Sequence, residues 1–143
     1  MHLKHPQISK LVGKINKDKK SIVIEYINAN TIFSLIDQES ENKNQSSFKY
    51  NKFSILLQIM LIVEYIHLNK YVMRDIHPNN LMIDKNNNVI LIDLCEMILH
   101  DMIEKKEIHT NDFSSPFICP ETNTPYYSYE SDIYSLGKVI YFI

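Results

Sequence analysis

The most informative stretch of this 143-residue chain is YVMRDIHPNNLMIDKNNNVILIDLC, which spans residues 71–95. Within it, the apolar runs 81–84 and 89–93 are separated only by the polar turn KNNN. Short apolar runs joined by an Asn-rich turn are typical of β-hairpins, so the sequence predicts a hairpin over residues 81–93.

Three oxygen-bearing side chains flank this predicted hairpin: Asp75 and Asn80 precede it, and Asp93 ends it. Mg²⁺ takes hard oxygen ligands and is commonly held by one or two protein groups together with substrate phosphates, so Asn80 and Asp93 are candidate metal ligands. A carboxylate beside such a site, here Asp75, is suited to orient an attacking hydroxyl and accept its proton. Taken singly, each of these residues is better explained as capping a turn or ending a strand, but all three in this order and spacing predict phosphoryl transfer.

The composition limits the class of protein. A length of 143 residues allows one ordinary domain. Lys and Arg total 15 against 17 Asp and Glu, so the net charge of −2 does not indicate a surface for nucleic acid. Cys95 and Cys119 are too few for a disulfide framework, and no apolar run approaches the roughly 18 residues of a membrane span. We therefore expect a cytoplasmic protein that binds neither nucleic acid nor membranes.

The N-terminal half predicts a second hairpin and an exposed loop. The β-branched, apolar runs 8–15 and 21–27 are separated by the polar turn NKDKK, which is the pattern of two paired strands. A short amphipathic piece, TIFSLI, follows at residues 31–36. Residues 39–50 are polar and predict an exposed loop.

Two segments of the remaining chain predict helices. Residues 53–70 are apolar on nearly every face, so we expect a helix that is buried within the domain. Residues 129–143 also have helical apolar spacing, but they end without Gly, Pro or a polar cap. We expect this helix to be cut short, with its tail VIYFI (139–143) exposed and the chain only marginally stable as a result.

The segment MRDIHPNN (73–80) resembles the catalytic loop H-R-D-[LI]-K-P-x-N of eukaryotic protein kinases, and residues 93–95 stand in the place of their D-F-G motif. Other blocks resemble the entry to the fourth small-lobe strand (5–11), the fifth strand and hinge (22–27), the A-P-E motif (119–121) and the start of the organising helix of the large lobe (131–137). The likeness covers essentially the whole chain. It implies a partial protein-kinase-like α+β fold, mostly α with two small hairpins, in which residues 1–27 supply small-lobe strands and hinge and residues 28–143 a truncated large lobe.

The resemblance implies catalytic roles for five residues. Asp75 would be the catalytic aspartate, with Asn80 and Asp93 as the magnesium ligands. His77 stands where Ser/Thr kinases carry a lysine that steadies the transferring phosphate, so we expect weaker transition-state stabilisation. Arg74 would pair with a phosphorylated residue further along the chain. The candidates for that residue are Thr110, Ser114 and Ser115.

The resemblance also implies ATP as the nucleotide and a protein hydroxyl as its acceptor. The backbone of Glu25 to Ile27 would hydrogen-bond adenine at the hinge. Ile24 would be the gatekeeper, Met82 the apolar floor under the base, and Thr31 would lie near the ribose.

Several positions depart from the pattern of the kinase family. Met73 and Leu94 replace an aromatic pair, and we expect them to fill the same hydrophobic column between Leu11 above and Asp132 below. We also expect the two cysteines to be buried thiols.

Three functions are compatible with these residues. The first is an ATP-dependent protein kinase of the Ser/Thr type, because residues 78–80 follow the P-x-N form. The second is a catalytically inactive, pseudokinase-like binding module, because the Gly-rich loop and β3 lysine of the family would precede Met1, and the only glycines are Gly13 and Gly137. The third is a small-molecule phosphotransferase, whose loop H-G-D-L-H-P-G-N is similar to residues 75–80.

Overall fold

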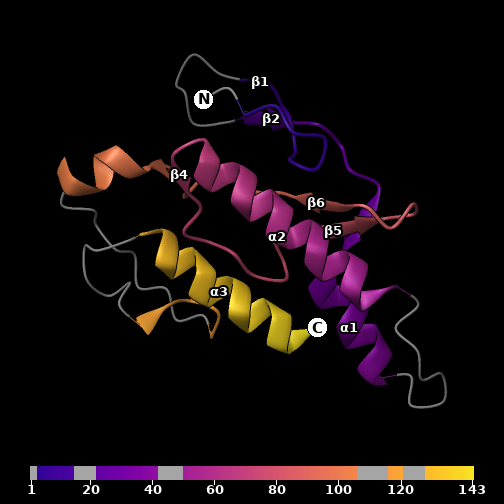
Figure 1. Ribbon diagram of the computed structural model, residues 1–143. Coiled ribbons are helices and arrows are strands. Elements are labelled where there is room, and N and C mark those ends of the chain that lie inside the picture. The colour runs from indigo at the N-terminus through magenta and orange to yellow at the C-terminus, as the bar shows by residue number, and fades with distance from the viewer. Residues whose placement is uncertain (1–2, 15–21, 42–49, 106–115, 121–127) are drawn as a thin grey trace.

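The computed structural model describes residues 3–14, 22–41, 50–105, 116–120 and 128–143, and it places helices beside small antiparallel sheets (Figure 1). The strands are β1 (Leu11–Lys14), β2 (Ile22–Ile24), β3 (Ala29–Thr31), β4 (Tyr71–Val72), β5 (Leu81–Asp84), β6 (Val89–Leu91) and β7 (Ile98–Leu99). The helices are α1 (Ile32–Glu41), α2 (Lys52–Leu68), the 3₁₀ helix η1 (His100–Lys105) and α3 (Tyr129–Phe142).

Both predicted hairpins are present. β1 pairs with β2, and β5 pairs with β6 in the register Met82 opposite Ile90. Two further strand pairings were not predicted: β3 adds to β5, and β4 pairs with β7. These extra strands have two or three residues and pair with partners far along the chain, so no local alternation announces them.

The first hairpin does not contribute to a closed hydrophobic column. Leu11 is 59% exposed, and its neighbour Val12 is exposed as well. The expected position of Leu11 above Met73 and Leu94 is therefore wrong for the described residues. Met73 is fully buried and Leu94 packs against the core, so the lower part of that column is present without Leu11.

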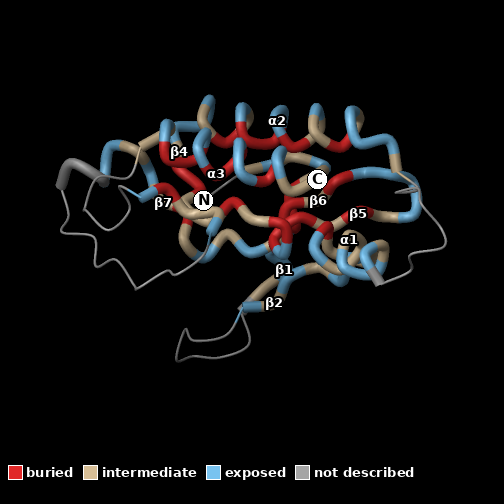
Figure 2. The backbone as a smooth tube through the Cα atoms, turned by 90° about the horizontal axis from the view of Figure 1, so that it is seen from below, coloured by how far each residue is buried: buried red, intermediate tan, exposed pale blue. Residues whose placement is uncertain are grey.

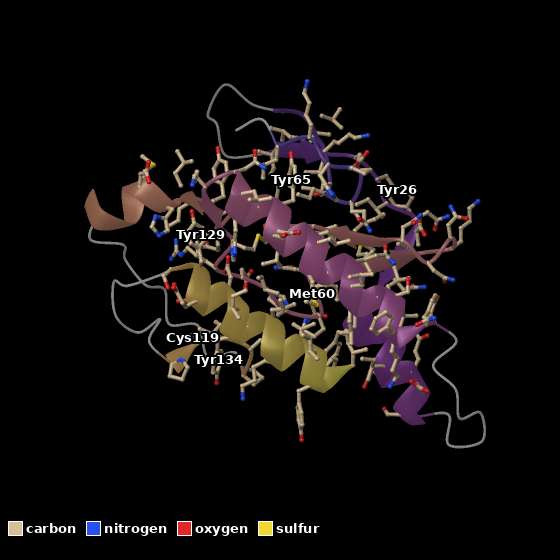
Figure 3. All side chains as sticks on the ribbon, in the orientation of Figure 1. Tyr26, Met60, Tyr65, Cys119, Tyr129 and Tyr134 are labelled. Atoms are coloured by element: carbon tan, nitrogen blue, oxygen red, sulfur yellow. The ribbon has the colours of Figure 1, made fainter. Side chains whose placement is uncertain are left out.

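Helix α2 packs against β4, β6 and α3. Its N-terminus is capped by Asn51, whose side chain accepts the Ser54 N–H at 3.1 Å. The buried side is formed by Ile55, Ile59, Ile62, Val63 and Ile66. The opposite side leaves apolar side chains in solvent, including Met60, which corrects the expectation of a helix buried all round (Figures 2 and 3).

Helix α3 lies beside α2 in Figure 1 and extends the core. Val139 is fully buried, and Phe142 contacts the rings of Phe33 from α1 and Phe117 at centroid distances of 6.0 and 5.5 Å. The expectation of a wholly exposed tail is therefore wrong, because α1 and the short segment 116–120 cover part of it. Of the tail, Ile140 and Tyr141 are exposed.

Helix α1 continues to Glu41, so the predicted loop 39–50 begins later than expected; residues 42–49 lie outside the described part of the chain. The N-terminal segment runs alongside the edge strand β6, where Ile8 forms a parallel bridge to Leu91. None of the described helices is long and apolar enough to span a membrane.

Candidate functional site

A buried carboxylate on α3 anchors the loop that carries the predicted catalytic residues. Asp132 is 1% exposed, and its two oxygens accept the backbone N–H groups of Met73 at 2.8 Å and Arg74 at 2.9 Å. His67 at the end of α2 lies 2.8 Å from the same carboxylate. A buried polar group is stable only where hydrogen bonds satisfy it, and here those bonds connect α2, α3 and the loop.

An aromatic stack supports this anchor. Tyr129, at the start of α3, lies with its ring 4.7 Å from the ring of His67 and 4.4 Å from that of His100 (Figure 3). The three rings connect the end of α2, the start of η1 and the start of α3. These contacts stabilise the end of α2, from which the catalytic loop continues.

Two residues of the site have positive φ angles although neither is glycine. Arg74 has φ 70° and Asp93 has φ 54°. This left-handed region is uncommon for residues with a Cβ, and it persists only where neighbouring contacts hold it. Such contacts are present here, because the N–H of Arg74 is bound by Asp132 and the Asp93 side chain accepts the N–H of Cys95 at 3.1 Å.

Asp75 is held by donors on both of its oxygens. The Asn80 amide donates to Oδ2 at 2.9 Å, and Nε2 of His77 lies 3.3 Å from Oδ1. Burial raises the pKa of Asp75, but the hydrogen bonds from His77 and Asn80 and the charges of His77 and Arg74 outweigh it and hold the pKa below its ordinary value. Asp75 is therefore an ionised, oriented carboxylate at neutral pH.

The amide of Asn80 has a defined orientation. Its Nδ2 donates to both the backbone oxygen of Asp75, at 3.1 Å, and the carboxylate, so its Oδ1 points the other way. No hydrogen bond to that Oδ1 occurs among the described residues. The N–H of Ile92 donates to the backbone oxygen of Asn80 at 2.9 Å, which brings Asp93, the next residue, to the same corner.

The residues at this corner suit a magnesium ion. The Asn80 amide oxygen and the Asp93 carboxylate are hard oxygen donors, and Mg²⁺ commonly takes one or two such protein ligands and completes its shell with phosphate oxygens and water. Within the described ranges, no group of three or more His, Cys, Asp and Glu side chains gathers as a protein-only metal cluster.

Cys95 lies beside this corner and is exposed, whereas Cys119 is buried, so the expectation of two buried thiols is wrong for Cys95. The thiol of Cys95 hydrogen-bonds the Asp93 carboxylate, and this bond, burial and the charges of Asp93 and Glu96 raise the pKa of the thiol. Cys95 is therefore protonated at neutral pH and is a poor nucleophile there.

A shallow pocket of about 300 Å³ lies between the hinge and the second hairpin. It is lined by Ile24, Glu25, Tyr26, Ile27, Met82 and Ile92. Five of these residues are among those expected at the nucleotide site: Ile24, Met82 and the hinge residues 25–27. In the described part of the chain, the backbone oxygen of Glu25 and the N–H of Ile27 make no hydrogen bond, so both are available to a planar heterocycle.

The structure brings the pocket and the catalytic loop together through Ile92, which lines the pocket and hydrogen-bonds Asn80. It does not bring Thr31 into the pocket lining. Thr31 pairs with Met82 across β3 and β5, and its hydroxyl accepts the Ser34 N–H at 3.1 Å, which caps α1.

Arg74 has an acidic neighbour within the described chain. Its Nη1 lies 3.7 Å from the carboxylate of Glu96 and donates to the Glu96 backbone oxygen at 3.4 Å. The predicted phosphate acceptors Thr110, Ser114 and Ser115 lie outside the described residues.

The comparisons with known proteins agree on one family. A family model for the protein kinase domain matches residues 1–143. The chain belongs to the protein kinase family. The carbon catabolite-derepressing protein kinases of Candida glabrata and Saccharomyces cerevisiae are each 32% identical to it, over 97% of this chain and 22% and 21% of their own lengths. The serine/threonine-protein kinase KIN4 of Saccharomyces cerevisiae is 26% identical over 98% of this chain and 17% of its own length.

The chain spans about a fifth of the length of these kinase relatives. The sequence did not predict the contact of His67 with Asp132 or that of Glu96 with Arg74. It placed Asp132 at the base of the hydrophobic column but did not predict its hydrogen bonds to the loop. A His that closes an apolar helix and an Asp in a helical apolar run are the available signals, but neither identifies a partner.

Proposed function

We propose that this chain carries the magnesium, adenine and catalytic-aspartate positions of an ATP-dependent serine/threonine protein kinase that acts in the cytoplasm. The observation that carries the proposal is the corner formed by Asp75, Asn80 and Ile92, which joins an oriented carboxylate to a pocket under the hinge. The chain has two cysteines, too few for a disulfide framework, and this count fits a reducing compartment.

The residues have distinct tasks in this proposal. The open backbone groups of Glu25 and Ile27 bind the adenine edge, and Met82 and Ile92 contact its face. Asn80 and Asp93 hold Mg²⁺, which when bound neutralises charge on the phosphates. Asp75 orients the hydroxyl of a serine or threonine and accepts its proton as the phosphoryl group transfers. Because its pKa is lowered, Asp75 is ionised but weakly basic, so orientation is its larger contribution.

The test is transfer of label from ATP to a generic protein substrate in the presence of Mg²⁺. We expect incorporation by the wild-type chain and its loss in Asp75→Asn. Asp84→Asn is the matched control, because Asp84 is also a hydrogen-bonded aspartate with a lowered pKa, but it lies at the hairpin turn. Equal incorporation by wild type and Asp75→Asn would contradict the proposal.

A second candidate function, a nucleotide-binding module without catalysis, is favoured by one observation. The nitrogen of His77 that would face the phosphate is directed at Asp75, so this position presents no free cation. Saturable binding of ATP with Mg²⁺, combined with no label transfer by the wild-type chain, would favour this module over the kinase.

A further inference from the structure

His77 makes two contacts that together define its ring orientation. Nδ1 accepts the backbone N–H of Asn79 at 3.2 Å, and Nε2 lies 3.3 Å from Oδ1 of Asp75. A ring rotated by 180° would place carbon atoms at both positions and lose both contacts. The observed orientation is therefore the one that satisfies the neighbours.

The same contacts define the tautomer of the neutral ring. A backbone N–H can only donate, so Nδ1 must act as an acceptor and carries no proton. The ring proton of neutral imidazole then resides on Nε2, the nitrogen that faces the carboxylate of Asp75.

The backbone around His77 holds the ring in place. Its carbonyl oxygen accepts the N–H of Asn80 at 3.0 Å, and the carbonyl of the buried Pro78 accepts the N–H of Phe33 from α1 at 3.3 Å. The side chain is 22% exposed, so it lies against the loop. The turn that follows His77 is thus closed by a hydrogen bond within the loop and held by a second one from α1.

We propose that His77 is a positioning residue, which as the Nε2–H tautomer donates to Oδ1 of Asp75 and holds the carboxylate against the Asn80 amide. Asp75 then has a donor on each oxygen before any substrate binds. One N–H cannot serve both the carboxylate and a transferring phosphate, so the position acts on Asp75 and not on the phosphate. The catalytic consequence rests on the proposed function; the hydrogen bond itself does not.

The first test is independent of any activity. Two-bond ¹H–¹⁵N correlation spectra of the full ¹⁵N-labelled chain, recorded about two pH units above the ordinary histidine pKa of about 6.5, report the tautomer of each ring. We expect His77 to show the Nε2–H pattern alone. A dominant Nδ1–H pattern, or an even mixture of both, would overturn the proposal whether or not the chain is a kinase.

The second test uses two variants that place an amide at different points of the imidazole. Gln at position 77 carries its N–H near the place of Nε2, whereas Asn reaches only as far as Nδ1. If wild type transfers phosphate, we expect His77→Asn to lower kcat roughly ten- to a hundredfold, with KM for ATP unchanged, and His77→Gln to stay within a few-fold of wild type. Equal losses in both variants, or a higher kcat in His77→Lys, would overturn the positioning role.

These outcomes separate the two proposals. Absence of transfer by wild type would contradict the proposed function and leave the tautomer measurement to decide the role of His77. A wild-type kinase with a mixed tautomer would retain the proposed function and remove the positioning role.

Discussion

The catalytic loop and the hinge differ in how they are held. The loop is tied to α3 by the buried Asp132, and its polar side chains bind one another. The hinge follows a two-stranded hairpin in which Leu11 and Ile24 are exposed, and Tyr26 of the hinge itself is 90% exposed. The catalytic loop is therefore held by hydrogen bonds to the rest of the chain, whereas the hinge, which would bind the base, is exposed to solvent. Stability should respond to changes in the loop, and nucleotide affinity to changes at the hinge.

The largest expected effect is on the anchor of the loop. Asp132→Ala leaves two backbone N–H groups and His67 without their acceptor in a buried position, and we expect the free energy of unfolding to fall by about 3 to 5 kcal/mol. Urea denaturation measures this loss. Asp37→Asn, at an exposed position on α1, is the control and should change stability by less than about 0.5 kcal/mol. Similar small losses in both variants would show that the loop does not depend on α3.

Asp75 makes a pH-dependent contribution to the same half of the molecule. Its pKa in the folded chain lies below the ordinary 3.8, so the folded state favours the ionised form and gains stability above that value. We expect the difference in unfolding free energy between wild type and Asp75→Asn to be full at neutral pH. It should shrink as the pH falls through the lowered pKa.

Denaturation series at several pH values measure this difference. Asp84 and Glu130, whose pKa values are also lowered, are present in both proteins, so their contributions cancel. A difference that grows as the medium becomes more acidic would contradict the network around Asp75.

The hinge half is tested by binding. Met82→Ala removes an apolar surface from the pocket, and we expect the Kd for ATP to rise about three- to tenfold while stability changes little. Ile90→Ala is the matched control, because Ile90 is the cross-strand partner of Met82 but lies outside this pocket. Calorimetric titration measures both, and equal effects on binding would place the nucleotide elsewhere.

The smallest expected effect is at the edge of the hinge half. Leu11→Ser should alter the free energy of unfolding by less than about 0.5 kcal/mol, because the side chain is already exposed. If urea unfolding shows that the free energy of unfolding falls by more than about 2 kcal/mol, Leu11 is packed in the hydrophobic column after all.

Parts of this structure were predictable because their signals are local. The two short apolar runs of the β5–β6 hairpin, the long apolar run of α2 and the helical apolar spacing of α3 each lie within a single window of sequence. The order of Asp75, Asn80 and Asp93 was also enough to suggest where a metal and a nucleotide would meet.

Other parts depend on contacts that sequence does not display. Asp132 accepts a hydrogen bond from Met73, which lies 59 residues earlier in the chain. The sequence alone does not distinguish such a buried aspartate from one exposed to solvent. Leu11 was expected in the hydrophobic column because of the resemblance, and the outer side of α2 was expected inside because it is apolar. Both are exposed, because apolar character alone does not determine which elements cover a surface. The exposure of Cys95 was likewise missed, because its surroundings follow from the turn after Asp93.

The most direct test of the central claim is paramagnetic broadening by Mn²⁺ with ATP, which reports the residues near the metal. We predict selective loss of the amide signals of residues 75, 80 and 93, weaker broadening at residues 25–27, and disappearance of the effect in Asp93→Asn. Broadening confined to another surface, or unchanged in Asp93→Asn, would contradict a nucleotide–metal site at this corner.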